Sequence, residues 1–213
     1  MTLFLSPENI QIANELLAWA HDYLMTENEN IKRPAGNQTV CPFVKGSVEN
    51  NSFYMDFHNE ITGHTVEEIE QVMNGNISKF KYLGPFNPND KYKKALLVIF
   101  PKLSEKQTYV LDRAHENIKS KFVSEGLMVG QFHKNCDTRG VYNPGFRVST
   151  SPYPLIAIRH MAIHDIIFIR DVPEWFNHYN LRFGNAFNEP DKIEDYNKHL
   201  VYYFNEAKKN LLK

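Results

Sequence analysis

Apolar residues repeat every three to four positions in several stretches of the chain, the spacing that gives a helix one apolar side. This pattern predicts helices at residues 6–25, 65–75 and 104–126, and further helices within 173–212. Polar residues able to cap a helix N-terminus precede four of them: Ser6, Thr65 with Glu68, Ser104 with Gln107, and Asp191 with Glu194.

Shorter apolar runs predict strands. Residues 53–58 alternate between apolar and polar, which is typical of a strand with one buried face. Residues 95–100 are apolar without a break until Pro101, which predicts an interior strand covered on both faces. Residues 127–132 form the next strand, and the helix before them is long enough for a right-handed crossover. Two further runs, 155–158 and 166–169, are joined by a short connection and are therefore expected to pair antiparallel.

Together these elements predict an α+β fold, with a mixed sheet of about five strands and helices packed on it. The chain has 213 residues and suits a single domain at 1–213. Within it we expect an N-terminal helix at 6–25, a core at 40–171 and C-terminal helices at 173–212. Hydrophobic residues make up 42% of the chain, enough to build an ordinary globular core.

Composition excludes some classes of function. The formal net charge is −1, from 24 basic and 25 acidic residues, so the chain lacks the basic footprint of a nucleic-acid-binding protein. It has no apolar run of the roughly 18 residues that a membrane span needs, and no basic region of a signal peptide. We therefore expect a cytoplasmic protein in which both cysteines, Cys41 and Cys136, are reduced.

Candidate chemistry gathers between Gly126 and Asp171, where titratable and cationic residues stand beside apolar runs. His133 directly follows a predicted strand and opens a loop that contains glycine and proline. A strand end is rigid and can aim a side chain into a cleft, which suits a metal or haem ligand or a general base. A histidine in an ordinary surface loop is the alternative.

His133 and Cys136 have the spacing H-x-x-C, with Asp137 next to them, and could share a metal ion. A closed zinc site needs four ligands, and Cys41 is far away in the sequence, which counts against this hypothesis. Cys136 also lacks the surrounding motif of a hydrolase nucleophile. Cys41, within Cys-Pro-Phe, fits a small buried residue, although a cysteine thiolate can also ligate haem iron.

Two arginines stand near predicted strand ends, Arg147 and Arg159, the latter followed by His160. A guanidinium group can form two parallel hydrogen bonds with a carboxylate or phosphate, so these residues could hold an acidic substrate or a haem propionate. Alternatively, Arg159 forms a structural ion pair with Asp165 or Asp171 at the end of the sheet.

The segments VCPFV, GLMVGQFHKN and NPGFRVSTSPYPLIAIRHM, followed by DIIFI, occur in this order along the chain. They resemble a bacterial family known only as a domain of unknown function, in which CPF, G-x-M-x-G-x-FH and P-L-x-A-I-R-x-M recur. The resemblance covers roughly residues 41–171. More distantly, the order is similar to the YqcI/YcgG-type family, whose members include haem-dependent N-hydroxylases acting on amino-acid guanidines or amines. The chain departs from that family in lacking a clear Trp-Pro after the loop.

The distant resemblance implies a haem-dependent oxygenase that binds b-type haem and N-hydroxylates a small amino-acid-like substrate in specialised metabolism. It implies His133 as the ligand of the haem iron, with Arg159, Arg147 and His160 as further cofactor-binding residues. The alternative is a non-catalytic module that binds a small ligand or a partner. The expected partner is a small molecule rather than nucleic acid or membrane, and a homodimer is the candidate oligomer.

Overall fold

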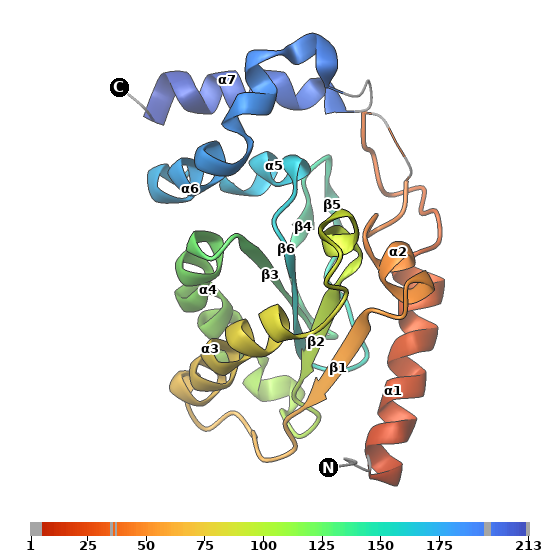
Figure 1. Ribbon diagram of the computed structural model, residues 1–213. Helices are drawn as coiled ribbons and strands as arrows, with labels where there is room; N and C mark the ends of the chain where they lie inside the picture. Colours follow the sequence, from red (N-terminus) through yellow and green to blue (C-terminus); the bar gives the residue numbers. More distant parts are fainter. Residues whose placement is uncertain (1–5, 35, 37, 194–196, 212–213) are drawn as a thin grey trace.

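The computed structural model describes residues 6–34, 36, 38–193 and 197–211. It confirms the α+β class: a four-stranded mixed sheet has helices on both faces, and a two-stranded hairpin lies beside it (Figure 1). The large sheet has the order β1 (Phe53–Phe57), β2 (Ala95–Ile99), β6 (Leu155–His160), β3 (Leu127–Phe132), and the hairpin pairs β4 (Arg139–Gly140) with β5 (Asn143–Arg147).

The helices are mostly those that the apolar spacing predicts. They are α1 (Pro7–Trp19), which continues as a π-helical turn (Ala20–Leu24), α2 (Val44–Glu49), α3 (Val66–Tyr82), α4 (Thr108–Ser124), α5 (Ile166–Ile169), α6 (Pro173–Phe183) and α7 (His199–Leu211). Short 3-10 turns lie at Pro88–Lys93, Glu105–Gln107, Ile163–Asp165, Gly184–Asn188 and Pro190–Lys192. None of the helices in the described ranges is long and apolar enough to cross a membrane.

The apolar strand β2 lies inside the sheet, as predicted, and all five of its residues are buried. It pairs parallel with β1 and antiparallel with β6, which in turn pairs antiparallel with β3. The crossover through α4 therefore joins two strands of the same direction, β2 and β3, that have β6 between them.

Side-chain alternation divides the core into two layers, because successive residues of a strand point to opposite faces. Leu96 and Val98 of β2 pack with α3 and α4 in the larger cluster, whereas Leu97 and Ile99 pack with α1 on the other face. Figure 1 shows α3 and α4 on one side of the sheet and α1 on the other. A third cluster joins α5, α6 and α7 at one end of the sheet.

The predicted strand at 166–169 is wrong, because these residues form the short helix α5. A run of four apolar residues has no periodicity that separates a strand from a buried helical turn. The tertiary structure decides, because β6 already has β2 on one side and β3 on the other and offers no edge for another strand. Ile166 and Ile169, three positions apart, are both fully buried against the C-terminal helices.

The helix that begins after Thr65 does not end near Gly75, as predicted, but continues to Tyr82. Ile77 and Phe80 prolong its buried side, and the burial of two more apolar residues outweighs the low helix propensity of one glycine. The predicted cap is confirmed, because the Thr65 side chain accepts a hydrogen bond from the Glu68 backbone N–H at 3.3 Å.

The other predicted caps have mixed outcomes. Ser6 accepts a hydrogen bond from the Asn9 backbone N–H at 3.2 Å, as expected. Ser104 instead donates to the Gln107 side chain at 2.6 Å, and a 3-10 turn precedes α4. The last predicted cap includes Glu194, which lies outside the described residues.

Candidate functional site

A cavity of about 590 Å³ opens where α1 leaves the sheet uncovered. We call it the sheet cavity. Strands β2, β6 and β3 form its floor. Its walls come from the end of the first helix, residues 30–33, 36 and 40–44, the β4–β5 hairpin and helices α4, α5 and α7. It therefore brings together segments from nearly the whole length of the chain.

Small residues on neighbouring strands make room for the sheet cavity. Gly130 of β3 pairs directly with Ala157 of β6, and Ala157 pairs with Leu97 of β2. Gly130 and Ala157 are only half-buried although they lie in the middle of a covered sheet. Their small size leaves space that larger side chains would fill, because packed protein interiors leave few voids.

The walls are largely apolar, but the charged residues that line the sheet cavity are strongly unbalanced. Within the described part of the chain, its apolar lining includes Trp19, Val40, Phe43, Phe53 and Phe132. The cationic residues are Lys32, Arg33, Lys119, Arg139 and Arg159, whereas Asp165 is the sole carboxylate. This positive lining contrasts with the net charge of −1 for the whole chain.

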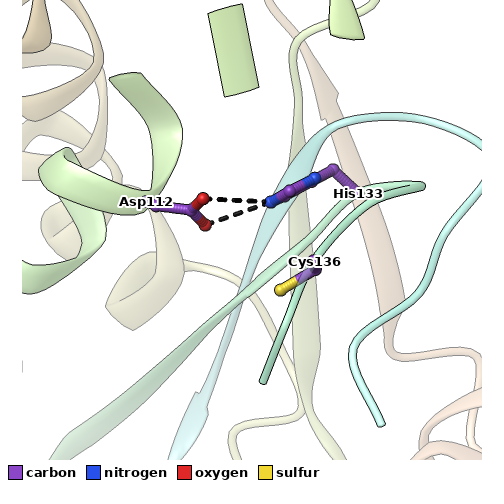
Figure 2. A group of neighbouring side chains, drawn as sticks. All are labelled: Asp112, His133 and Cys136. Atoms are coloured by element: carbon purple, nitrogen blue, oxygen red, sulfur yellow. Dashed lines mark hydrogen bonds and ion pairs between the residues drawn. The ribbon is translucent and has the colours of Figure 1, made fainter. Parts of the chain in front are cut away.

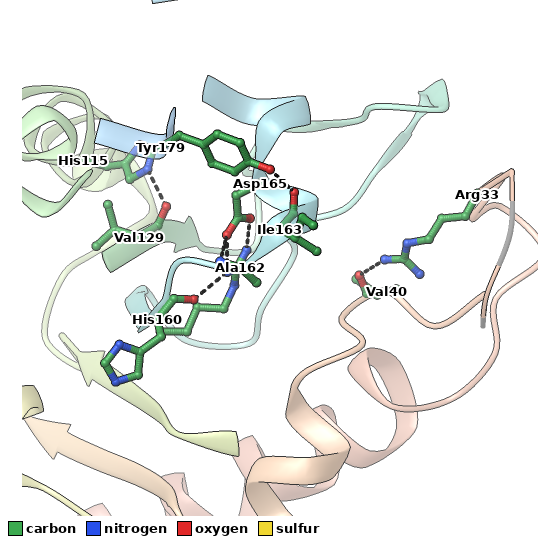
Figure 3. A network of polar contacts seen from close by, with 10 residues as sticks. Arg33, Val40, His115, Val129, His160, Ala162, Ile163, Asp165 and Tyr179 are labelled. Atoms are coloured by element: carbon green, nitrogen blue, oxygen red, sulfur yellow. Dashed lines mark hydrogen bonds and ion pairs between the residues drawn. The ribbon is translucent and has the colours of Figure 1, made fainter. Parts of the chain in front are cut away.

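Asp165 already has a partner, because Arg159 holds it in a two-pronged ion pair with N–O distances of 2.7 and 2.5 Å. Asp165 is fully buried and also accepts the Ala162 backbone N–H at 2.7 Å (Figure 3). The Arg159 guanidinium lies over the Phe43 ring, 4.4 Å from its centroid. The structural alternative for Arg159, an ion pair with Asp165, is thus confirmed, and the pair forms a rigid corner of the cavity.

Arg33 stabilises, through hydrogen bonds, the loop that forms one wall of the sheet cavity. It donates hydrogen bonds to the backbone carbonyls of Thr39 at 2.5 Å and of Val40 at 3.1 Å, the second of which is drawn in Figure 3. Burial lowers the pKa of Arg33 because a charged group is disfavoured away from water. The sequence offered a single signal for this role: one arginine in a breaker-rich loop just before Cys41.

Helix α4 contributes two further basic residues to the sheet cavity. Burial is also the main cause that lowers the pKa of Lys119, whose ammonium lies 4.6 Å from the Trp175 ring centroid. Burial, assisted by the Lys119 charge, lowers the pKa of His115 to about 4, so this imidazole is neutral near pH 7. Its Nε2 lies 3.2 Å from the Val129 carbonyl oxygen (Figure 3).

A second group of titratable side chains lies at the end of β3. His133 Nε2 is 3.1 and 3.2 Å from the two carboxylate oxygens of Asp112, which projects from α4 (Figure 2). Cys136 is beside them, with its Sγ 3.4 Å from the Thr138 hydroxyl oxygen. His133 and Cys136 are 3% and 1% exposed, so the sequence alternative of a surface loop histidine is wrong.

Contacts within this group shift the pKa values of His133 and Cys136 towards their ionised forms. Burial works against a charged His133, but the contacts with Asp112 and Cys136 prevail and raise its pKa to about 9. Burial likewise works to raise the pKa of the Cys136 thiol, but His133 and Thr138 prevail and lower it below its ordinary value. Cys136 and Cys41 are both free of disulfides, as expected from the sequence.

The structure does not bring the four predicted cofactor-binding residues together. Arg159 lines the sheet cavity, whereas His133 lines a separate cavity of about 280 Å³. His160 is the next residue of β6 and points to the opposite face, where its ring lies 5.1 Å from that of Phe80. Arg147 is exposed on the β4–β5 hairpin and pairs with Asp137 at 3.0 Å.

Sequence reasoning missed Asp112 as the partner of His133. The two residues are 21 positions apart, and Asp112 stands within an ordinary amphipathic helix. Asp137, the acidic neighbour in the sequence, instead pairs with Arg139 and Arg147 and is largely exposed.

No curated protein and no solved structure matches the chain. A family model does match, and it covers residues 13–194. This range includes the strands that form the floor of the sheet cavity and the Asp112–His133–Cys136 group. The chain therefore belongs to the family described as a domain of unknown function (DUF6875).

Proposed function

We propose that the protein binds a mostly apolar small molecule with an anionic group, and that it does so in the sheet cavity. The observation that carries this proposal is the charge of the lining: among the described residues, five cationic side chains and one carboxylate line a largely apolar space, although Arg159 pairs with that carboxylate and Arg139 with the neighbouring Asp137. The volume of about 590 Å³ lies within the range of roughly 300–1,000 Å³ that is usual for small-ligand sites.

The burial of the basic side chains indicates which of them a bound anion would stabilise most. Burial lowers the pKa of both Arg33 and Lys119, so their charged forms carry a desolvation cost in the free protein. A bound anion offsets that cost, because opposite charges attract more strongly where water is excluded. The apolar body of the ligand would lie on the floor made by Gly130 and Ala157.

A fluorescent apolar sulfonate, anilinonaphthalene sulfonate, tests this proposal by titration and by competition. We expect decanoate to displace the probe more tightly than decanol, and decylamine to displace it least. Ala157→Leu fills the floor of the cavity and should weaken probe binding at least tenfold. Ala186→Leu is the matched control, because Ala186 is exposed and lies outside the cavity lining. Equal displacement by the three competitors, or equal binding by the two variants, would refute the proposal.

Haem is the specific ligand that the distant resemblance implies, and its fit differs between the two cavities. His133 does not fit as the iron ligand, because its Nε2 faces Asp112 and the adjoining cavity measures about 280 Å³. The sheet cavity fits better: its apolar walls suit the ring, its cations suit the propionates, and His164 and Cys41, which line it, are of residue types that ligate haem iron. Bound haem would supply the dioxygen chemistry of N-hydroxylation.

Haemin titration distinguishes this specific proposal from the general one. If haem is the ligand, a Soret band develops with one haem per chain, and Ala157→Leu suppresses it. His164→Ala or Cys41→Ser should then shift the band, whereas His133→Ala and His160→Ala should leave it unchanged, since neither side chain lines the sheet cavity. Binding of the fluorescent probe without a Soret band would retain the anionic ligand and reject haem.

A further inference from the structure

The side chains of Asp112, His133 and Cys136 form a second candidate site, separate from the sheet cavity. They come from helix α4, from the residue after β3 and from the turn that follows it (Figure 2). Each of the three side chains offers one atom that could bind a metal ion: a carboxylate oxygen, a ring nitrogen and a thiol sulfur. These three atoms lie within 4.8 Å of one another, and among the described residues this is the group of histidine, cysteine and acidic side chains with that arrangement. None of the three residues lines the sheet cavity.

These distances suit a single bound ion. Three atoms no more than 4.8 Å apart always share a point within about 2.8 Å of each, compared with zinc bonds of about 2.0–2.3 Å to nitrogen, oxygen or sulfur. Shifts of less than about an ångström would therefore bring all three into the first coordination sphere. Three ligands leave one position of a tetrahedral ion open.

The turn holds two of the ligands in place before any ion binds. The Cys136 backbone N–H donates to the His133 carbonyl oxygen at 3.1 Å, which fixes the two side chains three residues apart on one tight turn. On the other side, the rigid helix α4 presents Asp112 to the His133 ring. A site prepared in this way loses little conformational entropy when it binds an ion.

The group is largely buried, but one ring nitrogen of His133 lacks a hydrogen-bond partner among the described residues and Asp112 is partly exposed to solvent. His133 is 3% exposed, and its Nδ1 has no hydrogen-bond partner among the described residues. This nitrogen is distinct from Nε2, which faces Asp112 and is therefore the ring atom placed to bind an ion, and a water molecule can complete Nδ1. Asp112 retains 39% exposure of its side chain and so connects the group with solvent.

We propose that Asp112, His133 and Cys136 bind a transition-metal ion, with Zn²⁺ as the ion that the ligand types favour. A thiolate and an imidazole select zinc and its transition-metal neighbours over Mg²⁺ and Ca²⁺, which prefer oxygen ligands alone. The ion would join α4 to the turn after β3, two segments that are distant in the sequence.

Cobalt titration of the metal-free protein tests the proposal, because Co²⁺ occupies zinc sites and reports a thiolate ligand by a near-ultraviolet charge-transfer band. We expect a band that saturates at one Co²⁺ per chain and disappears when Zn²⁺ is added. Cys136→Ser should abolish the band, whereas Cys41→Ser, the matched control at the other free cysteine, should retain it. The absence of a band in the wild type, or its survival in Cys136→Ser, would overturn the proposal.

Because Cys136 is buried, its variant could fail to fold, and a second variant keeps the test decisive. Asp112→Asn removes a half-exposed carboxylate and should leave the circular dichroism spectrum unchanged. Losing a ligand should weaken Co²⁺ binding by at least the roughly 10–100-fold that loss of an outer-shell group costs. Unchanged affinity in folded Asp112→Asn would remove Asp112 from the site and refute the three-ligand arrangement. Ala157→Leu should not change Co²⁺ binding, so the two proposals fail independently.

Discussion

Replacing Asp165 with Asn tests the role of the buried ion pair beside the sheet cavity. Asp165 is fully buried and accepts three hydrogen bonds, two from Arg159 and one from the Ala162 backbone. Asn has nearly the same shape but no charge, so the Arg159 guanidinium would lose its counterion. Removing one partner of a buried pair typically costs about 3–5 kcal/mol, because the other charge stays buried.

The structure places the expected loss at the lower end of that range. The Arg159 side chain is 20% exposed, so solvent screens part of its charge, and Asn retains one oxygen as an acceptor for the Ala162 N–H. We therefore expect Asp165→Asn to lower the free energy of unfolding by about 3 kcal/mol. For a chain of this length, that corresponds to a fall in Tm of about 6–12 °C.

Urea unfolding followed by circular dichroism measures the effect, with Asp137→Asn as the matched control. Asp137 also pairs with arginines, Arg139 and Arg147, but its side chain is 68% exposed. An exposed pair contributes about 0–1 kcal/mol, so the control should change little. Adding Arg159→Met to Asp165→Asn should recover part of the lost stability by removing the unpaired charge. If Asp165→Asn costs no more than Asp137→Asn, the reasoning about burial is wrong.

Two further predictions concern backbone conformation and pH. Gly126 has φ of +75°, and a Cβ there would lie 2.7 Å from Arg182 Nε, so Gly126→Ala should lower the free energy of unfolding by about 1–2 kcal/mol. Gly75 lies inside α3 with open space around it, so Gly75→Ala should raise the free energy of unfolding by about 0.5–1 kcal/mol. Equal unfolding midpoints would contradict this. Burial is the main cause that lowers the pKa values of His115 and His160 to about 4. Between about pH 6.5 and 4 the unfolded chain therefore binds more protons than the folded protein, so the free energy of unfolding falls as the pH drops through this window. Replacing either with Gln should flatten that fall, and an NMR titration of His115 centred near 6.5 would contradict the reasoning.

The sequence by itself determined the local elements with strong periodicity. The uninterrupted apolar run at 95–100, stopped by Pro101, favoured an interior strand, since it has no polar face for water, and β2 is fully buried. Gly126 marks the end of α4 because its positive φ suits a residue without Cβ. These features depend on a few neighbouring residues, so they are visible in the sequence.

The tertiary structure alone decided the identity of α5 and the composition of the two candidate sites. Residues 166–169 could not form the expected pair with β6, because β2 and β3 already flank it, and α3 passed Gly75 because its apolar side continued into the core. Asp112 reaches His133 only because α4 packs beside β3, and Arg159 is separated from His160 by the alternation of β6. The sheet cavity exists because the helices leave small residues uncovered, which is a property of packing between distant segments and leaves no periodic signal in the chain.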